Sequence, residues 1–309
     1  MTSIELDSTP ATSIDFYSAA TPPVATLSSG DTLAVHTLDA NGHTQRQQTP
    51  GEDVAMLLPG GRGHCLVGPI AIEGATPGMT LAVHIDSLRP DDWGFTSAGK
   101  ADTPLNRRLG IDEPASLLWQ LDADAATGTN DLGHTVALAP FLGVIGIAPE
   151  ATGEFSTIPP RSIGGGNIDC RELVAGSTLF LPIAVAGALL YVGDGHAAQG
   201  DGEVGGTAIE CGMTSRLTLD VIDDAALGSI HATTPAGRIT FGFDADLNEA
   251  TAQALTAMIG WMQQLYGIGK SEALALASVV VSMRVTQIAN QTWGVHALLP
   301  EGAVGEASR

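Results

Sequence analysis

The chain is short of basic residues. Only 13 of its 309 residues are lysine or arginine, and only Lys100 and Lys270 are lysines. Because there are 34 aspartates and glutamates, the formal net charge is −21. Nucleic-acid binding relies on lysine and arginine to neutralise phosphates, so the composition argues against a nucleic-acid partner. The excess of acid predicts a solvated, repulsive surface, with adaptation to salt or attraction of cations as the alternatives.

Cysteine is also scarce. Cys65, Cys170 and Cys211 are odd in number, far apart and without a C-x-x-C pair, which argues against a disulfide framework or a cysteine-rich zinc knuckle. The first residues lack the basic and apolar regions of a signal peptide. Pro182 and Gly187 interrupt the apolar run at 179–192, which is too short to cross a bilayer. We therefore expect a cytoplasmic protein without a membrane partner.

Long helical patterns are rare as well. The 38 glycines and 17 prolines favour turns and short strands, and a hydrophobic share of 44% supplies a large core. We therefore expect a mainly β fold. The exception is an amphipathic helix that begins after Asp246 and ends at Gly267. A second helix at 272–278 and a strand at 279–288 are expected to follow it.

The length exceeds that of one typical compact domain, so we expect more than one unit. The best boundary lies in the loop-like segment 151–166, where Pro159-Pro160 removes two backbone donors. The predicted division is 1–158, 159–240 and 241–309. Locally, Gly30-Asp31 is predicted to form a hairpin turn, and residues 90–113 a loop.

The most informative stretch is GDGHAAQGDGE at 193–203, which follows an apolar run at 184–192. Glycines let a backbone turn tightly and approach a ligand closely. Its first residues fit G-x-G-x-x-G/A, but a dinucleotide site also needs a helix to begin there. The sequence that follows, QGDGEVGG, cannot sustain a helix, because each interior glycine costs about 1 kcal/mol. A nucleotide site is therefore rejected.

The same region is rich in metal-ligating side chains. Hard divalent ions prefer carboxylates, and zinc also takes imidazole. Repulsion among several nearby acids raises their pKa values unless a cation or an arginine compensates. We therefore predict a cation site, with a solvated acidic turn as the alternative. Its candidate residues are Asp169, Asp194, His196, Asp201, Glu203 and Glu210, and His64 in a second glycine-rich turn is a further candidate.

Familiar nucleophile motifs are missing, because the chain has neither G-x-S-x-G nor H-E-x-x-H. Cys170 directly follows Asp169, yet such a cysteine is more often a small buried side chain than a nucleophile. His296, beside Trp293, is expected to be packed. Two alternatives stay open: a metal-free hydrolase that uses Cys170, and a non-catalytic small-molecule binding protein on the same mainly β fold.

Several segments resemble the acetamidase/formamidase family. The most specific are GGGNIDCREL (164–173), GSTLFLPI (176–183) and GALLYVGDGHAAQGDGEVGGTAIE (187–210). Supporting matches are GHCLVGPIAIEGATPG (63–78), PFLGVIGIAPE (140–150), STIPPRSIGGGNID (156–169) and VTQIANQTWGVHALLP (285–300). The resemblance covers most of the chain. It departs at Cys170-Arg171, at Gly205 and in the 90–110 segment, which matches poorly.

The resemblance implies a fold and an activity. The fold is a β-sandwich over 1–158, a smaller β-barrel-like unit over 159–240 that carries the glycine-rich loop, and an α+β portion over 241–309. The activity is hydrolysis of the C–N bond of small linear amides, such as formamide and acetamide, to a carboxylate and ammonia. Hydrolysis of a cyclic amide (a γ-lactam) is the alternative. A homo-oligomer and a divalent metal, zinc with calcium as the second possibility, are also implied.

The residues and the resemblance together suggest specific roles. Amide hydrolysis needs activated water, a polarised carbonyl and protonation of nitrogen, which a metal and a carboxylic acid can supply. Asp169 and His196 are predicted to bind the metal, with Glu210 or His64 completing its ligands. Glu203 is the predicted general acid/base, and Asp194 is predicted to orient or co-ligate. The residues predicted to bind the substrate amide are Gln199 and Gly195.

Overall fold

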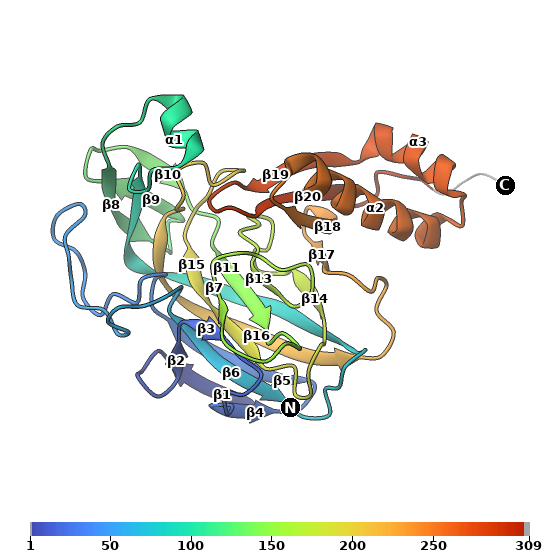
Figure 1. Ribbon diagram of the computed structural model, residues 1–309, viewed down its shortest axis with the longest axis horizontal. Helices are drawn as coiled ribbons and strands as arrows, with labels where there is room; N and C mark the ends of the chain where they lie inside the picture. The colour runs from blue at the N-terminus through green and yellow to red at the C-terminus, as the bar shows by residue number, and fades with distance from the viewer. Residues whose placement is uncertain (1, 306–309) are drawn as a thin grey trace.

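The computed structural model describes residues 2–305, in which strands far outnumber helices (Figure 1). The helices are α1 (Pro104–Leu109), α2 (Leu247–Tyr266) and α3 (Lys270–Val280). The strands are β1 (Ser3–Asp7), β2 (Ser13–Ile14), β3 (Phe16–Tyr17), β4 (Ala25–Leu27), β5 (Asp31–Thr37), β6 (Leu66–Ile72), β7 (Thr80–Ala98), β8 (Ala115–Asp122), β9 (Thr127–Asn130), β10 (Thr135–Ala137), β11 (Phe141–Ile147), β12 (Phe155–Ser156), β13 (Gly165–Asn167), β14 (Thr178–Pro182), β15 (Leu190–His196), β16 (Glu210–Ile222), β17 (His231–Thr234), β18 (Gly237–Asp244), β19 (Ser282–Gln287) and β20 (Trp293–Pro300).

Two runs of paired strands make up most of the fold. The longer run follows the order β1-β5-β16-β7-β14-β17-β18-β20-β19, and β8, β9 and β10 continue from β7. In the shorter run β6 pairs with β2, β4 and β15, then β15 with β11 and β11 with β13. The two runs join where β15 pairs with β16, at Gly195↔Cys211 and His196↔Glu210. This junction carries two of the predicted metal ligands.

The strands beside the junction are buried along their whole length. All seven residues of β11, FLGVIGI, and of β15, LYVGDGH, are buried, as their nearly continuous apolar sequences predict. By contrast, β5 alternates between buried and half-buried residues, which is the pattern of a strand with one face on the core. Polar residues at the end of β15 are therefore held in a dry and rigid part of the sheet.

The C-terminal portion packs two helices beside β18 and β20 (Figure 1). The predicted long helix is confirmed as α2: the Asp246 side chain accepts a hydrogen bond from Asn248 N, and Gly267 ends the helix in the left-handed conformation. The second helix, α3, is longer than predicted, and β19 is shorter than the strand predicted at 279–288. Ala250, Ala254 and Met258 of α2 are fully buried, so this face of the helix belongs to the core.

The mainly β fold with a C-terminal α+β portion is confirmed, but the described strands form no closed barrel. Strands on both sides of residue 158 pair with each other, as in β7–β14 and β11–β15, so the division into 1–158, 159–240 and 241–309 stays a prediction. None of the helices described between residues 2 and 305 is apolar enough over a sufficient length to span a membrane.

Two local predictions were wrong. Gly30-Asp31 does not join a hairpin, because β4 pairs with β6 while β5 pairs with β1 and β16. Residues 90–113 are not all loop, since β7 extends to Ala98 and α1 follows at Pro104. In both segments the long-range partner strand, which local turn propensity does not specify, decides the structure.

The close approach of α2 to β18 gives a stability test. A Cβ at Gly242 would lie 2.0 Å from the Ala250 carbonyl oxygen, which is main chain and cannot rotate away. Gly242→Ala is therefore expected to destabilise the protein by at least about 3 kcal/mol, seen as a lower thermal or denaturant midpoint. Gly260→Ala, within α2 and with no neighbour inside 4 Å, is the control and should gain about 1 kcal/mol. Equal midpoints for the two variants would contradict this packing.

Candidate active site

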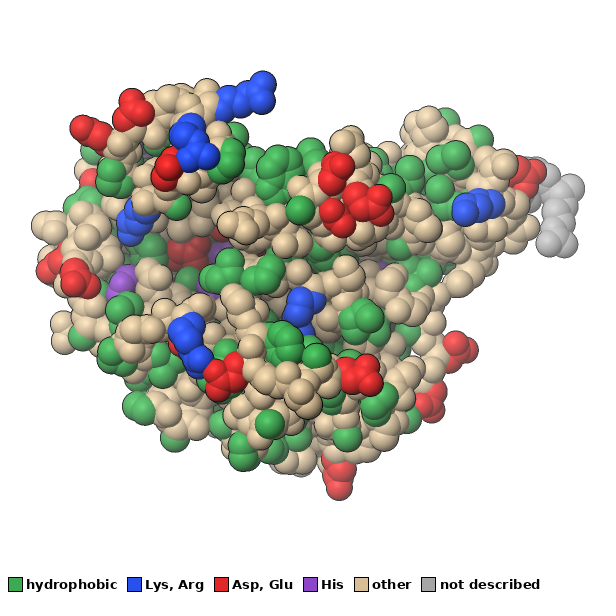
Figure 2. All heavy atoms as spheres, in the orientation of Figure 1, with side chains coloured by type: hydrophobic (Ala, Val, Ile, Leu, Met, Phe, Trp, Pro, Cys, Tyr) green, Lys and Arg blue, Asp and Glu red, His purple; other side chains and the backbone are tan. Residues whose placement is uncertain are grey.

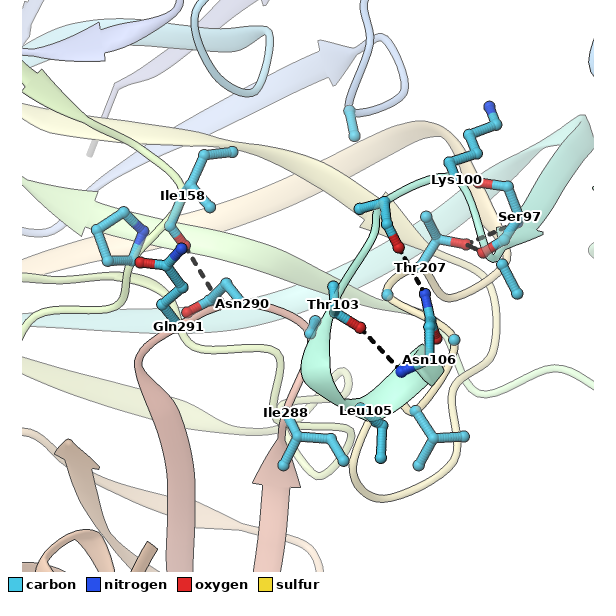
Figure 3. A pocket seen from close by; sticks show the side chains of 18 of the residues that line it. Ser97, Lys100, Thr103, Leu105, Asn106, Ile158, Thr207, Ile288, Asn290 and Gln291 are labelled. Atoms are coloured by element: carbon cyan, nitrogen blue, oxygen red, sulfur yellow. Dashed lines mark hydrogen bonds between the residues drawn. The ribbon is translucent and has the colours of Figure 1, made fainter. Parts of the chain in front are cut away.

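A cavity of about 1150 Å³ opens beside the junction of the two strand runs. Figure 2 shows a hollow in the corresponding face, with acidic and histidine atoms at its floor. One wall is formed by the segment from Ser97 to Asn106, which includes the first residues of α1, and by the loop 204–207. The opposite wall holds Ile158 and the loop 288–293 between β19 and β20 (Figure 3). His64, Asp194 and Glu210 line the same cavity.

Five titratable side chains cluster where Asp194 and Glu210 reach the cavity. Each is less than one-tenth exposed: Asp169, Asp194, His196, Glu203 and Glu210. They form two overlapping sets that share His196, one with Asp169 and Glu203 and the other with Asp194 and Glu210. Within each set the possible ligand atoms lie within 4.8 Å of one another. Sequence reasoning therefore identified residues that the fold does bring together.

The spacing of these atoms suits a bound ion. His196 Nε2 lies 3.4 Å from Asp194 Oδ1 and 3.3 Å from Glu210 Oε2. Two ligands held about 2.1 Å from a tetrahedral zinc ion are themselves about 3.4 Å apart. Both oxygens of Asp169 and Oε2 of Glu210 are buried without a hydrogen-bond partner. Because buried carboxylates normally have partners, these three oxygens fit a divalent cation.

Strand register explains the arrangement. His196 and Glu210 are direct cross-strand partners in β15 and β16, and Asp194 precedes His196 by two residues in β15. Asp169 comes just after β13, which pairs with β11, the neighbour of β15. The main chain therefore fixes Asp194 and Glu210 on paired strands, and Asp169 just after β13, before any ligand binds.

Backbone strain is concentrated in the same place. Asp169, Asp194 and Glu203 have φ values of 52°, 60° and 44°, and they are three of only six non-glycine residues with positive φ among those described. Non-glycine residues in this region cost about 1–3 kcal/mol each. Such strain clusters at functional sites, because only the surrounding structure can maintain it.

Gln199 contacts the ring nitrogen of His196 that does not face the carboxylates. His196 Nδ1 and Gln199 Oε1 are 2.9 Å apart, and Gln199 Nε2 donates to the Asp169 carbonyl oxygen at 2.8 Å. Because an amide oxygen only accepts, His196 carries a proton on Nδ1 and presents Nε2 to the carboxylates. We predicted that Gln199 binds the substrate amide, but both ends of its side chain are engaged by the protein. In the structure it fixes the orientation of the His196 ring.

Burial and charge perturb every titratable group in the cluster. Burial, reinforced by Glu203, raises the pKa of Asp169 well above its usual value. Burial likewise raises the pKa of Glu203 to about 8 and that of Glu210 to about 7. Burial alone would raise the pKa of Asp194, but His64 and His196 outweigh it and lower that pKa. Without a cation, the cluster therefore retains protons that free carboxylic acids lose at neutral pH.

Three other predicted residues have different positions. His64 lines the cavity with Nε2 3.9 Å from Asp194 Oδ2, and Thr157 Oγ1 lies 3.0 Å from its Nδ1. Gly195 lies between strands, because a Cβ there would be 2.7 Å from the Cys211 carbonyl oxygen. Asp201 is outside the cluster and pairs with Arg284 at 2.6 Å. The prediction that Asp201 adds to the metal-ligating set was therefore wrong, because Arg284, which is distant in the sequence, pairs with Asp201 and neutralises it.

Gly143 is a site residue that sequence reasoning missed. A Cβ at this position would lie 2.5 Å from Asp194 Oδ2, 2.8 Å from Asp169 Oδ1 and 2.8 Å from His196 Cε1. Only glycine leaves room for these groups to converge. The available signal was a glycine in the middle of the otherwise bulky buried strand FLGVIGI, where glycine often marks a close approach.

Comparison with known proteins gives consistent matches. The model of the acetamidase/formamidase family matches residues 10–156 and 151–300. An acetamidase of Mycolicibacterium smegmatis is 30% identical over 52% of this chain and 53% of its own length, and a formamidase of Methylophilus methylotrophus is 27% identical over 59% and 57%. The chain thus spans about half the length of the curated relatives it matches. A solved acetamidase of Bacillus halodurans has a TM-score of 0.86 and 26% identity, with 96% of this chain and 97% of that chain covered.

Gly143 provides a test of the converging geometry. Gly143→Ala is expected to keep the fold, because the atoms it meets are ends of side chains, but to lower zinc affinity at least about tenfold by displacing them. Isothermal titration of metal-free protein measures the change. Gly200→Ala, in the same glycine-rich segment and without a neighbour inside 4 Å, is the matched control. Wild-type affinity in the Gly143 variant would refute the assigned geometry.

Proposed function

The chain belongs to the acetamidase/formamidase family, and we propose that it is an amidohydrolase that cleaves the C–N bond of small linear amides to give a carboxylate and ammonia. The observation that carries this proposal is the buried cluster of four carboxylates around His196, of which Asp194 and Glu210 line the cavity. An amide carbonyl is weakly electrophilic and ammonia is a poor leaving group, so the reaction needs both electrostatic polarisation and proton transfer. The cluster offers groups for both.

His196, Asp194 and Glu210 are the residues assigned to hold a divalent metal, and Asp169 faces the same imidazole from the other set. Zinc is favoured over calcium, because calcium takes six to eight oxygen ligands and an imidazole suits zinc. When bound, zinc would supply Lewis-acid polarisation of the amide carbonyl and activation of water. This assignment makes Asp194 a ligand as well as an orienting group.

Glu203 is the proposed proton carrier. With a pKa of about 8 in the metal-free cluster, it holds a proton at neutral pH and can pass it to the leaving nitrogen. Burial is the largest cause of this raised pKa, and the charges of Glu210 and Asp194 add to it, whereas His196 and the neighbouring Asp169 act in the opposite direction. His64, at the cavity wall, stabilises the Asp194 carboxylate.

The size of the cavity bears on the substrate. A volume of about 1150 Å³ far exceeds that of formamide, so an amide with a larger acyl group, or a cyclic amide, also fits. This volume is the reason to keep γ-lactam hydrolysis as the second candidate. Leu105, Ile158 and Ile288 supply apolar surface, whereas Asn106 and Asn290 supply polar groups (Figure 3).

Two alternatives remain: a metal-free hydrolase that uses Cys170, and a non-catalytic binding protein. Cys170 is fully buried beside Glu172 and its thiol pKa is raised by burial, so it is poorly placed to attack a substrate. A non-catalytic binding protein would release no ammonia from any amide. We also propose a cytoplasmic location, in keeping with three buried free cysteines, and a homo-oligomer, which the family resemblance implies.

Replacement of the proton carrier is the sharpest test of the chemistry. Glu203→Gln is expected to lower kcat for formamide by about 10²–10⁴-fold, because the amide keeps the shape but cannot transfer the proton. Turnover is measured on folded, zinc-loaded protein, with Glu150→Gln, an exposed carboxylate, as the control. Unchanged turnover in the Glu203 variant would remove its role, while equal loss in the control would point to a nonspecific effect.

Metal removal tests the proposed activity as a whole. Ammonia release is measured with formamide, acetamide, propionamide, urea and a γ-lactam, before and after chelation. We expect at least one linear amide to be hydrolysed, chelation to abolish hydrolysis, and added zinc to restore it. Exclusive activity on the lactam would favour the second candidate. Ammonia release that survives complete chelation would contradict a metal-assisted reaction.

A further inference from the structure

A second group of metal-ligating side chains lies outside the cluster around His196. Cys170, Glu172 and His296 each offer one ligand atom, and these atoms lie within 4.8 Å of one another. Cys170 and His296 are fully buried and Glu172 is 9% exposed. The described residues that line the large cavity include none of the three. The mechanism proposed above makes no use of this group.

The distances centre on one carboxylate oxygen. Glu172 Oε2 lies 3.3 Å from Cys170 Sγ and 3.3 Å from His296 Nε2. Sulfur, nitrogen and oxygen ligands of a tetrahedral zinc ion are separated by about 3.3–3.7 Å, given bond lengths of about 2.0–2.3 Å. Two of the three separations therefore match those that a shared ion requires, and the third, between Cys170 Sγ and His296 Nε2, is within 4.8 Å.

An unpartnered nitrogen points into this group. His296 Nε2 is buried without a hydrogen-bond partner, because its contact with Glu172 lacks the alignment of a hydrogen bond. The other ring nitrogen, Nδ1, lies 2.8 Å from Thr286 Oγ1. A metal-bound histidine usually has its second ring nitrogen held by a hydrogen bond, a part that the Thr286 hydroxyl can take here while Nε2 faces Glu172.

The charges around the group also suit a divalent ion. Arg284 pairs with Oε1 of Glu172 and with Asp201, so that Oε2 of Glu172 faces only Cys170 and His296 among its charged or metal-ligating neighbours. With Cys170 as a thiolate, these four charged side chains together carry two negative charges more than positive charges, which one divalent ion balances. Burial keeps His296 neutral by lowering its pKa to about 4, so Nε2 is available as a ligand.

We propose that Cys170 Sγ, Glu172 Oε2 and His296 Nε2 form a second, structural metal site that binds zinc. The thiolate and imidazole donors select zinc over calcium or magnesium. Burial and Glu172 raise the pKa of the Cys170 thiol, so zinc binding releases a proton from it. The proposal does not rest on amide hydrolysis.

The site would stabilise the loop that carries Glu203. The Thr286 carbonyl accepts a hydrogen bond from Gly202 N at 3.1 Å, and Gly202 in turn accepts from Ile288 N at 2.8 Å. Arg284 fixes the same loop through Asp201. A metal that ties His296 and Glu172 together therefore braces both β19 and the residue next to Glu203. Loss of the metal is expected to lower the melting temperature by several °C.

Cobalt titration distinguishes this site from the cluster around His196, which offers only oxygen and nitrogen ligands. Metal-free full-length protein is titrated with Co²⁺, and the near-ultraviolet absorption of a cobalt thiolate is recorded. We expect the band in wild type, its loss in Cys170→Ser, and its retention in the control variants Cys65→Ser and Cys211→Ser. Zinc content should fall from two ions per chain in wild type to one in Cys170→Ser.

A second variant protects the test against misfolding. His296→Gln keeps the thiol and is expected to weaken cobalt binding, followed through the same band, at least tenfold. Absence of the band in folded wild type, its persistence in Cys170→Ser or wild-type affinity in His296→Gln would each overturn the proposal in favour of a hydrogen-bonded trio. Since the absorption band does not depend on turnover, failure here and failure of the proposed amidase activity can be told apart.

Discussion

Mutual repulsion among four buried carboxylates around His196 is the constraint on which the rest of this structure depends. Taking several acids out of water is costly unless they keep protons or share a cation. The protein accepts this cost at one place, the junction at which β15 pairs with β16 and the two strand runs meet. The left-handed backbone of Asp169, Asp194 and Glu203 adds local strain. A divalent ion would relieve the repulsion and so couple stability to activity.

The surroundings of the cluster serve to hold it in place. Gln199 sets the tautomer of His196, and the missing side chain of Gly143 leaves the space in which the carboxylates converge. Farther out, Arg284 joins Asp201 to Glu172 and connects the glycine-rich loop to β19. The acidic residues near the glycine-rich loop therefore divide into two neighbouring groups. One surrounds His196 beside the cavity, and the other, Asp201 and Glu172, pairs with Arg284.

Much of this arrangement was predictable from sequence. The apolar strand that leads into GDGHAAQGDGE, together with the family resemblance, pointed to Asp169, His196, Glu203 and Glu210, and the long C-terminal helix followed from its periodicity and caps. What sequence could not supply was the partner of each strand. For that reason local signals predict a hairpin at Gly30-Asp31 and a loop at 90–113, where β7 continues to Ala98. They also place Asp201 with the cluster, although Arg284, 83 residues away in the sequence, neutralises it.

The most direct test of the central claim is anomalous X-ray scattering at the zinc absorption edge, from crystals of zinc-loaded protein. We expect an anomalous peak within about 2.0–2.2 Å of His196 Nε2 and of carboxylate oxygens of the cluster around it. A well-ordered cluster with no anomalous peak, in crystals of protein that still hydrolyses amides at the full rate in the same zinc-containing solution, would contradict it.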